Sequence, residues 1–289
     1  MSPRPAGAHG APWLESGEDR LSEVDVTAGR GAPPERRRGR LLWLALVAAF
    51  VLGSVIGGVF FVHAQTLRAR FLMIPADSIP GDAELMKFAM SRGAPAYAEH
   101  CASCHGAHLQ GDSTLAVPNL ADHDWLYGTG RVSEIERVIL YGIRSGNSKG
   151  WDLAHMPAFA TSRPYDLYAM VPLSPGDIHD VASYLLSFRE RQADSAAVQR
   201  GKQIFYDTNK GVCTDCHGSD AKGDSAIGAP DLTDAIWLRG DGSRQGIEDT
   251  IAHGLAGRCP AWITELSPET IRAVAVYVYS ASGAGEKLE

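Results

Sequence analysis

The longest apolar stretch of the chain lies close to its N-terminus. Residues 41–62 (LLWLALVAAFVLGSVIGGVFFV) form a run of 22 residues without a charged side chain. At a rise of about 1.5 Å per residue, such a helix spans the roughly 30 Å hydrocarbon core of a bilayer. The pattern therefore predicts one transmembrane helix over 41–62. Arginines at 36–38 and 40 precede it, and the positive-inside rule places that end in the cytoplasm, despite Arg68 and Arg70 on the far side.

The segments on either side of this helix predict a tail and a linker. Residues 1–40 scatter Gly, Pro and Arg without apolar periodicity, which is typical of a disordered cytoplasmic tail. We assign residues 63–84 to a linker. A cleaved signal peptide is the alternative, because Val62-His63-Ala64 resembles a small-residue cleavage site. The long apolar run and the long polar stretch before it favour an uncleaved anchor.

Farther along the chain, apolar positions recur with helical spacing in two segments. Ser174-Pro175 and Ser267-Pro268 resemble helix starts, with serine as N-cap and proline at the first helical position. Both segments carry apolar residues at i, i+3, i+4 and i+7, which predicts one face packed on a core. These residues are Ile178, Val181, Ala182 and Leu185 in the first segment, and Ile271, Val274, Ala275 and Val278 in the second.

The second half of this region repeats the first. At an offset of 112 residues, identical residue types coincide at many positions, among them Cys101 and Cys213, Trp125 and Trp237, and Gly142 and Gly254. Two copies predict two domains, 85–195 and 196–289, each close to the usual domain size. The expected fold is therefore all-α, with two tandem domains behind one transmembrane helix.

Charge narrows the class of partner. The chain has a formal net charge of −7, and the part from residue 63 onward has −8. An acidic soluble part favours a basic protein face as partner over nucleic acid or an anionic lipid surface. Membrane lipid would be contacted through the anchor alone.

Four of the five cysteines fall in two identical C-x-x-C-H patterns. On one helical turn, residues i, i+3 and i+4 share a face, so two thiols can bond a haem while the adjacent imidazole reaches its iron. A zinc site would want four ligands, and a thioredoxin-like pair would need a βαβ pattern, so the motifs predict two covalently bound haem c groups. The predicted attachment residues are Cys101, Cys104 and His105 in the first motif, and Cys213, Cys216 and His217 in the second.

A low-spin haem iron takes a sixth ligand on the side opposite the motif histidine. Met156, followed by Pro157, is the candidate for the first haem, and Met170 is its rival. Pro118 and Pro230 are expected each to present a backbone carbonyl to the free N–H of a motif histidine.

The fifth cysteine, Cys259, opens a Cys-Pro-Ala-Trp segment at the repeat position of Met156-Pro157-Ala158-Phe159. We predict that it is the distal ligand of the second haem, as a thiolate. His253 is the rival ligand. A buried apolar cysteine beside a five-coordinate haem is the remaining alternative.

These motifs resemble a known family. Residues 85–285 are similar to the dihaem subunit (subunit III) of the cbb-type, or C-family, cytochrome c oxidases, through CASCHG and CTDCHG, PNL and PDL, WLYG and WLRG, and MPAF. The resemblance implies two tandem class I cytochrome c domains, an inner-membrane anchor and periplasmic haems. It departs from the family at Cys259, where the family has methionine.

Three functions follow from these features. The first is electron transfer in a periplasmic respiratory chain, as an oxidase subunit or a free-standing relay, from a donor cytochrome or quinol-oxidising complex to an acceptor oxidase or cytochrome. The second is an enzyme, because dihaem thiosulfate dehydrogenases combine a His/Met haem with a His/Cys haem, here in the opposite order. The third is a haem-based redox or gas sensor, for which residues 1–40 are short and polar. We favour them in that order.

Overall fold

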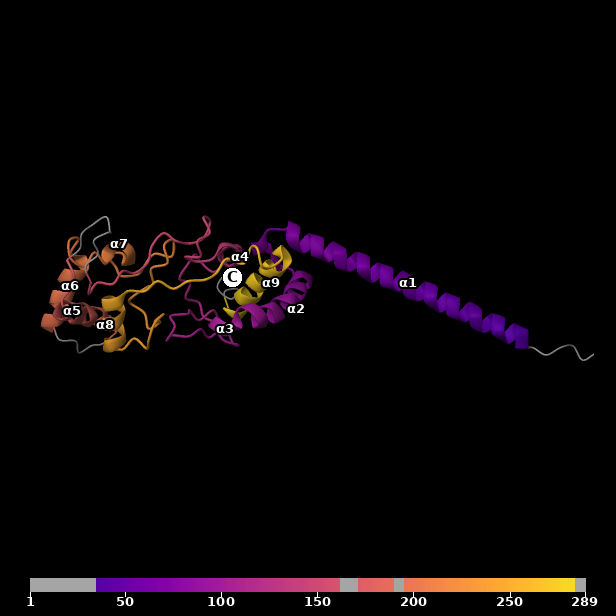
Figure 1. Cartoon of the computed structure of the whole chain (residues 1–289), viewed down its shortest axis with the longest axis horizontal. Helices are drawn as coiled ribbons and strands as arrows, with labels where there is room; N and C mark the ends of the chain where they lie inside the picture. The colour runs from indigo at the N-terminus through magenta and orange to yellow at the C-terminus, as the bar shows by residue number, and fades with distance from the viewer. Residues whose placement is uncertain (1–34, 162–170, 190–194, 284–289) are drawn as a thin grey trace, which may run out of the picture. The chain divides into compact units, whose positions relative to one another are not determined.

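The computed structural model describes residues 35–161, 171–189 and 195–283, and among these the regular elements are helices, joined by long loops with isolated β-bridges (Figure 1). This confirms the predicted all-α class. In chain order the helices are α1 (Glu35–Met73), the 3-10 helix η1 (Ala76–Gly81), α2 (Ala83–His100), α3 (Ala102–His105), α4 (Val132–Tyr141), α5 (Pro175–Leu186), α6 (Ser195–Tyr206), α7 (Thr214–His217), α8 (Arg244–His253) and α9 (Pro268–Ala281).

Helix α1 contains the whole predicted span 41–62, and its large apolar side chains there are exposed. It is long and apolar enough to cross a membrane. The helix also runs on to Met73, through part of the segment that the sequence assigned to a linker. Its end is fixed by Arg272 of α9, whose guanidinium donates to the backbone carbonyls of Phe71, Leu72 and Ile74 at 2.9–3.1 Å. These carbonyls lack partners inside the helix, so the arginine caps it.

The two predicted helix starts are confirmed by their caps. The Ser174 hydroxyl accepts from the Asp177 amide at 3.2 Å, while the Asp177 carboxylate accepts from the Ser174 amide, a reciprocal capping box. Ser267 caps α9 by accepting from the Thr270 amide at 3.1 Å. Each cap satisfies amides that the first helical turn leaves free.

Helix packing does not follow the two repeats. The last helix of the second repeat, α9, packs against α2 and α4 of the first repeat (Figure 1). The last helix of the first repeat, α5, packs against α6 and α8 of the second. The apolar stripe of α9 is therefore buried in the first repeat's core, and the stripe of α5 in the second repeat's core. The last helix of each repeat therefore packs on the core of the other repeat.

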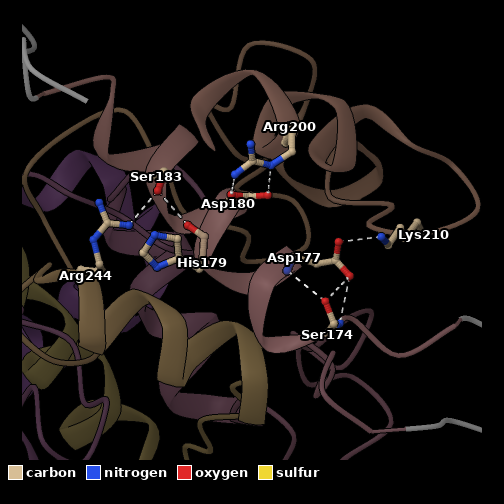
Figure 2. Close-up of polar contacts among 8 residues, drawn as sticks. All are labelled: Ser174, Asp177, His179, Asp180, Ser183, Arg200, Lys210 and Arg244. Carbon is tan, nitrogen blue, oxygen red and sulfur yellow. Dashed lines mark hydrogen bonds and ion pairs between the residues drawn. The ribbon is translucent and has the colours of Figure 1, made fainter. Parts of the chain in front are cut away.

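The polar contacts of α5 repeat this exchange (Figure 2). Asp180 is buried and accepts two hydrogen bonds from Arg200 of α6, at 2.6 and 2.7 Å. Ser183 accepts from Arg244 of α8 at 2.7 Å. A buried carboxylate is costly unless it is paired, so the pair with Arg200 holds α5 on α6.

The contact of α9 with the first repeat and the contact of α5 with the second repeat use equivalent residues. Arg272 on α9 pairs with Glu136 on α4 at 3.0 Å, and His179 on α5 lies 2.9 Å from Glu248 on α8. Glu136 and Glu248 are 112 residues apart, the offset of the sequence repeat. Equivalent repeat positions therefore make both contacts.

Two glycines allow the crossing helices to approach closely. A Cβ on Gly93 of α2 would lie 2.2 Å from the Ala273 carbonyl oxygen of α9. A Cβ on Gly201 of α6 would lie 1.9 Å from the Asp180 carbonyl oxygen of α5. Any larger residue must push the helices apart, so both crossings require glycine.

Candidate functional site

Each C-x-x-C-H motif forms a single helical turn that brings its three side chains to one face. The His105 amide donates to the Cys101 carbonyl at 3.0 Å, and the His217 amide donates to the Cys213 carbonyl at 2.9 Å. Residues i, i+3 and i+4 of a helix are neighbours on its surface, so each turn presents two thiols and an imidazole together. This is the arrangement that thioether attachment needs.

The motif histidines are oriented by the prolines named from the sequence. The Nδ1 atom of His105 lies 3.3 Å from the Pro118 carbonyl oxygen, and Nδ1 of His217 lies 3.0 Å from that of Pro230. The predicted proline contacts are therefore confirmed. Burial lowers the pKa of both histidines, although these hydrogen bonds oppose the shift. A neutral imidazole with Nδ1–H bound to a carbonyl leaves Nε2 free to ligate a metal.

The thiols of the motifs are held in apolar surroundings. Burial raises the pKa of Cys101 to about 11, with a further contribution from Cys104, and raises that of Cys213 to about 12. None of the five cysteines, all of which lie in described residues, forms a disulfide. The Cys101 and Cys213 thiols are therefore protonated at neutral pH.

Both motifs line one cavity of 890 Å³ with mostly apolar walls. Its volume is near the upper end of the roughly 300–1,000 Å³ of small-molecule and cofactor sites. The predicted residues Cys101, Cys104, His105, Met156, Cys213, Cys216, His217 and Cys259 all line it.

The cavity wall also contains a polar atom in need of a partner. The indole Nε1 of Trp237 is buried and has no hydrogen-bond partner among the described residues. A buried donor costs about 1–3 kcal/mol if it stays unpaired, and a haem carries two carboxylates that can accept from it. The residues present therefore fit a haem in shape, thiols, imidazole and polar donor.

Cys259 does not lie where the sequence predicted. Its backbone pairs with Ile143, just after α4 of the first repeat, through two hydrogen bonds of 2.9 Å. Burial, followed by the Cys101 and Cys104 thiols of the first motif, raises the pKa of the Cys259 thiol to about 11. Cys259 thus faces the first motif. The sequence predicts Cys259 as the distal ligand of the second haem, and its role as a ligand stays a prediction.

Met156, in turn, lies beside the motif of the second repeat. Its backbone pairs with Leu255, just after α8 of the second repeat, through hydrogen bonds of 2.9 and 3.0 Å. Its side chain packs on the apolar cluster that also holds Cys213 and Trp237. Met156 therefore faces the second motif, whereas we had assigned it to the first.

The rival ligands are placed less favourably. His253 is exposed at the end of α8, its Nδ1 lies 3.0 Å from the Asp249 carbonyl oxygen, and it does not line the cavity. Met170 lies outside the described residues.

Sequence reasoning missed Arg144, which joins the segment after α4 to the segment after α8. Its guanidinium donates to the Gly257 carbonyl at 2.6 Å, the Ala154 carbonyl at 2.9 Å and the Tyr127 hydroxyl at 3.0 Å. Its own carbonyl accepts from Arg258 at 2.9 Å. Arg144 lies two residues beyond Gly142, where the repeat alignment breaks, so no sequence signal marked it.

The fold and the site define a class of protein. Residues 90–189 match the family model for cytochrome c, and residues 196–278 match the model for cytochrome c oxidase, cbb3-type, subunit III. Together with α1, this makes the chain a membrane-anchored electron-transfer protein with cytochrome c domains and covalently bound haem c.

Individual relatives narrow the class. The cbb3-type cytochrome c oxidase subunit FixP of Azorhizobium caulinodans is 38% identical over 224 residues, covering 76% of this chain and 70% of the relative. FixP of Rhizobium meliloti is 36% identical over 209 residues, with coverages of 72% and 65%. Subunit CcoP of Cereibacter sphaeroides is 33% identical over 218 residues, with coverages of 75% and 70%. The chain belongs to the FixP/CcoP family of cbb3-type cytochrome c oxidase subunits, and the aligned part spans about two thirds of these relatives' length.

Proposed function

We propose that the chain binds two haem c groups and relays electrons between them, from a periplasmic donor toward an oxygen-reducing oxidase of which it is a subunit. The observation that carries this proposal is the single cavity lined by both motifs. When bound, each haem iron supplies a one-electron redox centre. The chain's own residues hold each imidazole neutral and oriented, and the apolar walls exclude water.

The partners follow from the charge and from the relatives. The haem-bearing part is acidic, with a net charge of −8 from residue 63 onward, so a donor or acceptor with a basic face would be attracted to it. The relatives are subunits of oxidases by name. The donor in this account is a soluble cytochrome or a quinol-oxidising complex, and the acceptor is the oxidase core.

The anchor would place the haems on the outer side of the inner membrane. Arginines at 36–38 and 40 precede the span. On the other side, Arg68 pairs with Glu269 at 2.5 Å, and Arg70 pairs with Asp82 and Glu84. These last two arginines pair within the folded haem-bearing part, so the basic cluster that precedes the span marks the cytoplasmic end. A tag at Ser2 should resist protease in spheroplasts while the haem domains are digested.

Haem content and co-purification test the proposal together. Full-length chain purified in detergent should carry two haems by alkaline pyridine spectroscopy, and it should co-purify with an oxidase core from native membranes. One haem per chain, or a chain that migrates free of any oxidase, would overturn it. The relatives do not favour a thiosulfate-dehydrogenase-like enzyme. Thiosulfate should therefore not reduce the isolated protein.

A further inference from the structure

The segments that carry Cys259 and Met156 pass each other at the centre of the haem-bearing part. After α4 the chain runs from the first pocket to Met156 in the second, and after α8 it runs back to Cys259 in the first. Arg144 and Arg258 fasten the two passing segments to each other, through the Gly257 and Arg144 carbonyls. The exchange of α5 and α9 agrees with this crossing, because α5 and α9 are the next helices after the Met156 and Cys259 segments.

We propose that each haem site is assembled from both repeats: the haem on Cys101, Cys104 and His105 takes Cys259 as its distal ligand. The haem on Cys213, Cys216 and His217 takes Met156. This inference rests on the proposed binding of two haems. It differs from a chain of two self-sufficient cytochrome domains, in which each motif histidine would be matched with the distal ligand of its own repeat.

Neighbouring side chains support the crossed assignment of Cys259. Trp262, three residues after it, places its ring 5.6 Å from the ring of His100, which directly precedes the first motif. The Trp262 amide donates to the Ile139 carbonyl of α4 at 3.0 Å. The Cys-Pro-Ala-Trp segment is therefore docked on the first repeat, and Cys259 lines the cavity together with Cys101 and Cys104.

Forming the bond between Cys259 and iron would release one proton and transfer no electron. On binding, the Cys259 thiol would lose its proton to solvent, and its sulfur would supply the electron pair of the bond to ferric iron, whose oxidation state would not change. A thiolate carries a negative charge and favours ferric iron, whereas the thioether of Met156 is neutral and favours ferrous iron. The first haem would then have the lower potential and the second the higher.

Removing one haem at a time tests which pocket holds the thiolate. Three full-length proteins are compared by EPR in the ferric state: wild type, Cys101→Ala with Cys104→Ala, and Cys213→Ala with Cys216→Ala. The narrow low-spin signal of a thiolate-bound haem should persist when the second motif is removed. It should disappear when the first is removed, and also in Cys259→Ala. The signal persisting without the first motif and vanishing without the second would overturn the crossed assembly.

Haem counting in the same proteins separates this inference from the proposed function. A single haem in the wild type would contradict the function. Two haems with the thiolate on the second motif would leave the function standing and contradict the crossing alone.

Because a protein that lacks one haem can fail to accumulate, a charge exchange provides a test with both haems in place. Asp180→Arg should lower the melting temperature, and adding Arg200→Asp should restore it, since these two side chains form the pair between α5 and α6. The matched control adds Arg92→Asp instead. Arg92 stands one residue before Gly93, as Arg200 stands before Gly201, but it pairs with Glu269 of α9 at 2.7 Å. Restoration by Arg92→Asp rather than Arg200→Asp would overturn the exchange.

Discussion

In the pocket of the first motif, Cys259 lies beside Cys101 and Cys104, whereas in the pocket of the second motif Met156 packs in the cluster that holds Cys213. The scaffolds around them match, with a proline carbonyl on each motif histidine and a last helix taken from the other repeat. The two nearly equivalent surroundings thus differ in a sulfur-bearing side chain, which is a cysteine beside the first motif and a methionine beside the second. Exchanging an anionic thiolate for a neutral thioether would set two haems to different potentials while the fold stays the same.

Replacing either sulfur ligand should produce the largest change, because it alters the reduction potential of one haem. Cys259→Met should raise the potential of the first haem by a few tenths of a volt, within the roughly 0.8 V over which axial ligands move haem potentials. The reason is that a neutral thioether replaces an anionic thiolate. Potentiometric titration with optical detection measures both haems at once.

The reciprocal variant serves as the control for that titration. Met156→Cys should lower the potential of the second haem and leave the first unchanged. If Cys259→Met changed neither potential, or moved the haem of the second motif, the assignment of ligands to pockets would be wrong.

Substituting the glycines at the two helix crossings should have the next largest effect, a loss of unfolding free energy. Gly93→Ala and Gly201→Ala each place a methyl group within 2.2 Å of a backbone oxygen. Overpacking of this kind costs roughly 1–3 kcal/mol of unfolding free energy. Thermal or urea unfolding of the full chain in detergent measures the loss.

Gly246 provides a matched helical glycine, because a Cβ there would meet only ordinary contacts, at 3.5 Å from Ser243 and 3.7 Å from Asp241. Gly246→Ala should be neutral or slightly stabilising, since alanine favours helix by about 1 kcal/mol over glycine. Equal stability of all three variants would show that α2 and α6 do not meet α9 and α5 as closely as the structure has them.

Replacing Asp124, an acidic residue without a counterpart in the second repeat, should have the smallest effect, a change in stability that depends on pH. Asp124 lines the cavity, and Ile236 stands at its repeat position. Burial, followed by the carboxylates of Asp234 and Asp122, raises the pKa of Asp124 to about 6. A folded-state pKa above the ordinary value of 3.8 means that the group favours folding at low pH, and that this contribution is lost as the pH rises through about 6.

Asp124→Asn should therefore stabilise the protein at pH 8 and have little effect at pH 4. The expected gain is on the order of 1 kcal/mol, because the side chain is partly exposed and solvent screens its charge. Unfolding at the two pH values measures it, with the exposed Asp152→Asn as control. A gain of the same size at both pH values would be inconsistent with a buried, ionising Asp124.

Much of the molecule was predictable from local patterns. The caps at Ser174 and Ser267 and the apolar stripes behind them specify helices whatever lies around them. The motif cysteines, the histidines and the prolines that orient them follow from short-range spacing. The membrane helix follows from the length of an uncharged run.

The pairing of the two halves was not predictable, and the reason lies in the repeat itself. The stripe with Val181 on α5 and the stripe with Val274 on α9 have the same spacing, so either helix suits either core. Only contacts between residues distant in sequence separate the two arrangements, such as Arg272 with Glu136. Aligning Cys259 with Met156 correctly identified equivalent positions, but it could not tell which motif each one faces.

The contact between two tyrosine rings tests the exchange most directly. The rings of Tyr97 on α2 and Tyr277 on α9 lie with centroids 5.3 Å apart, and the rings of Phe205 on α6 and Tyr184 on α5 lie 5.4 Å apart. In the full-length ferrous protein with labelled aromatic rings, NMR should give a nuclear Overhauser effect between Tyr277 and Tyr97. An effect between Tyr277 and Phe205 in its place would mean that each repeat encloses its own last helix, and would contradict the crossed assembly of the haem sites.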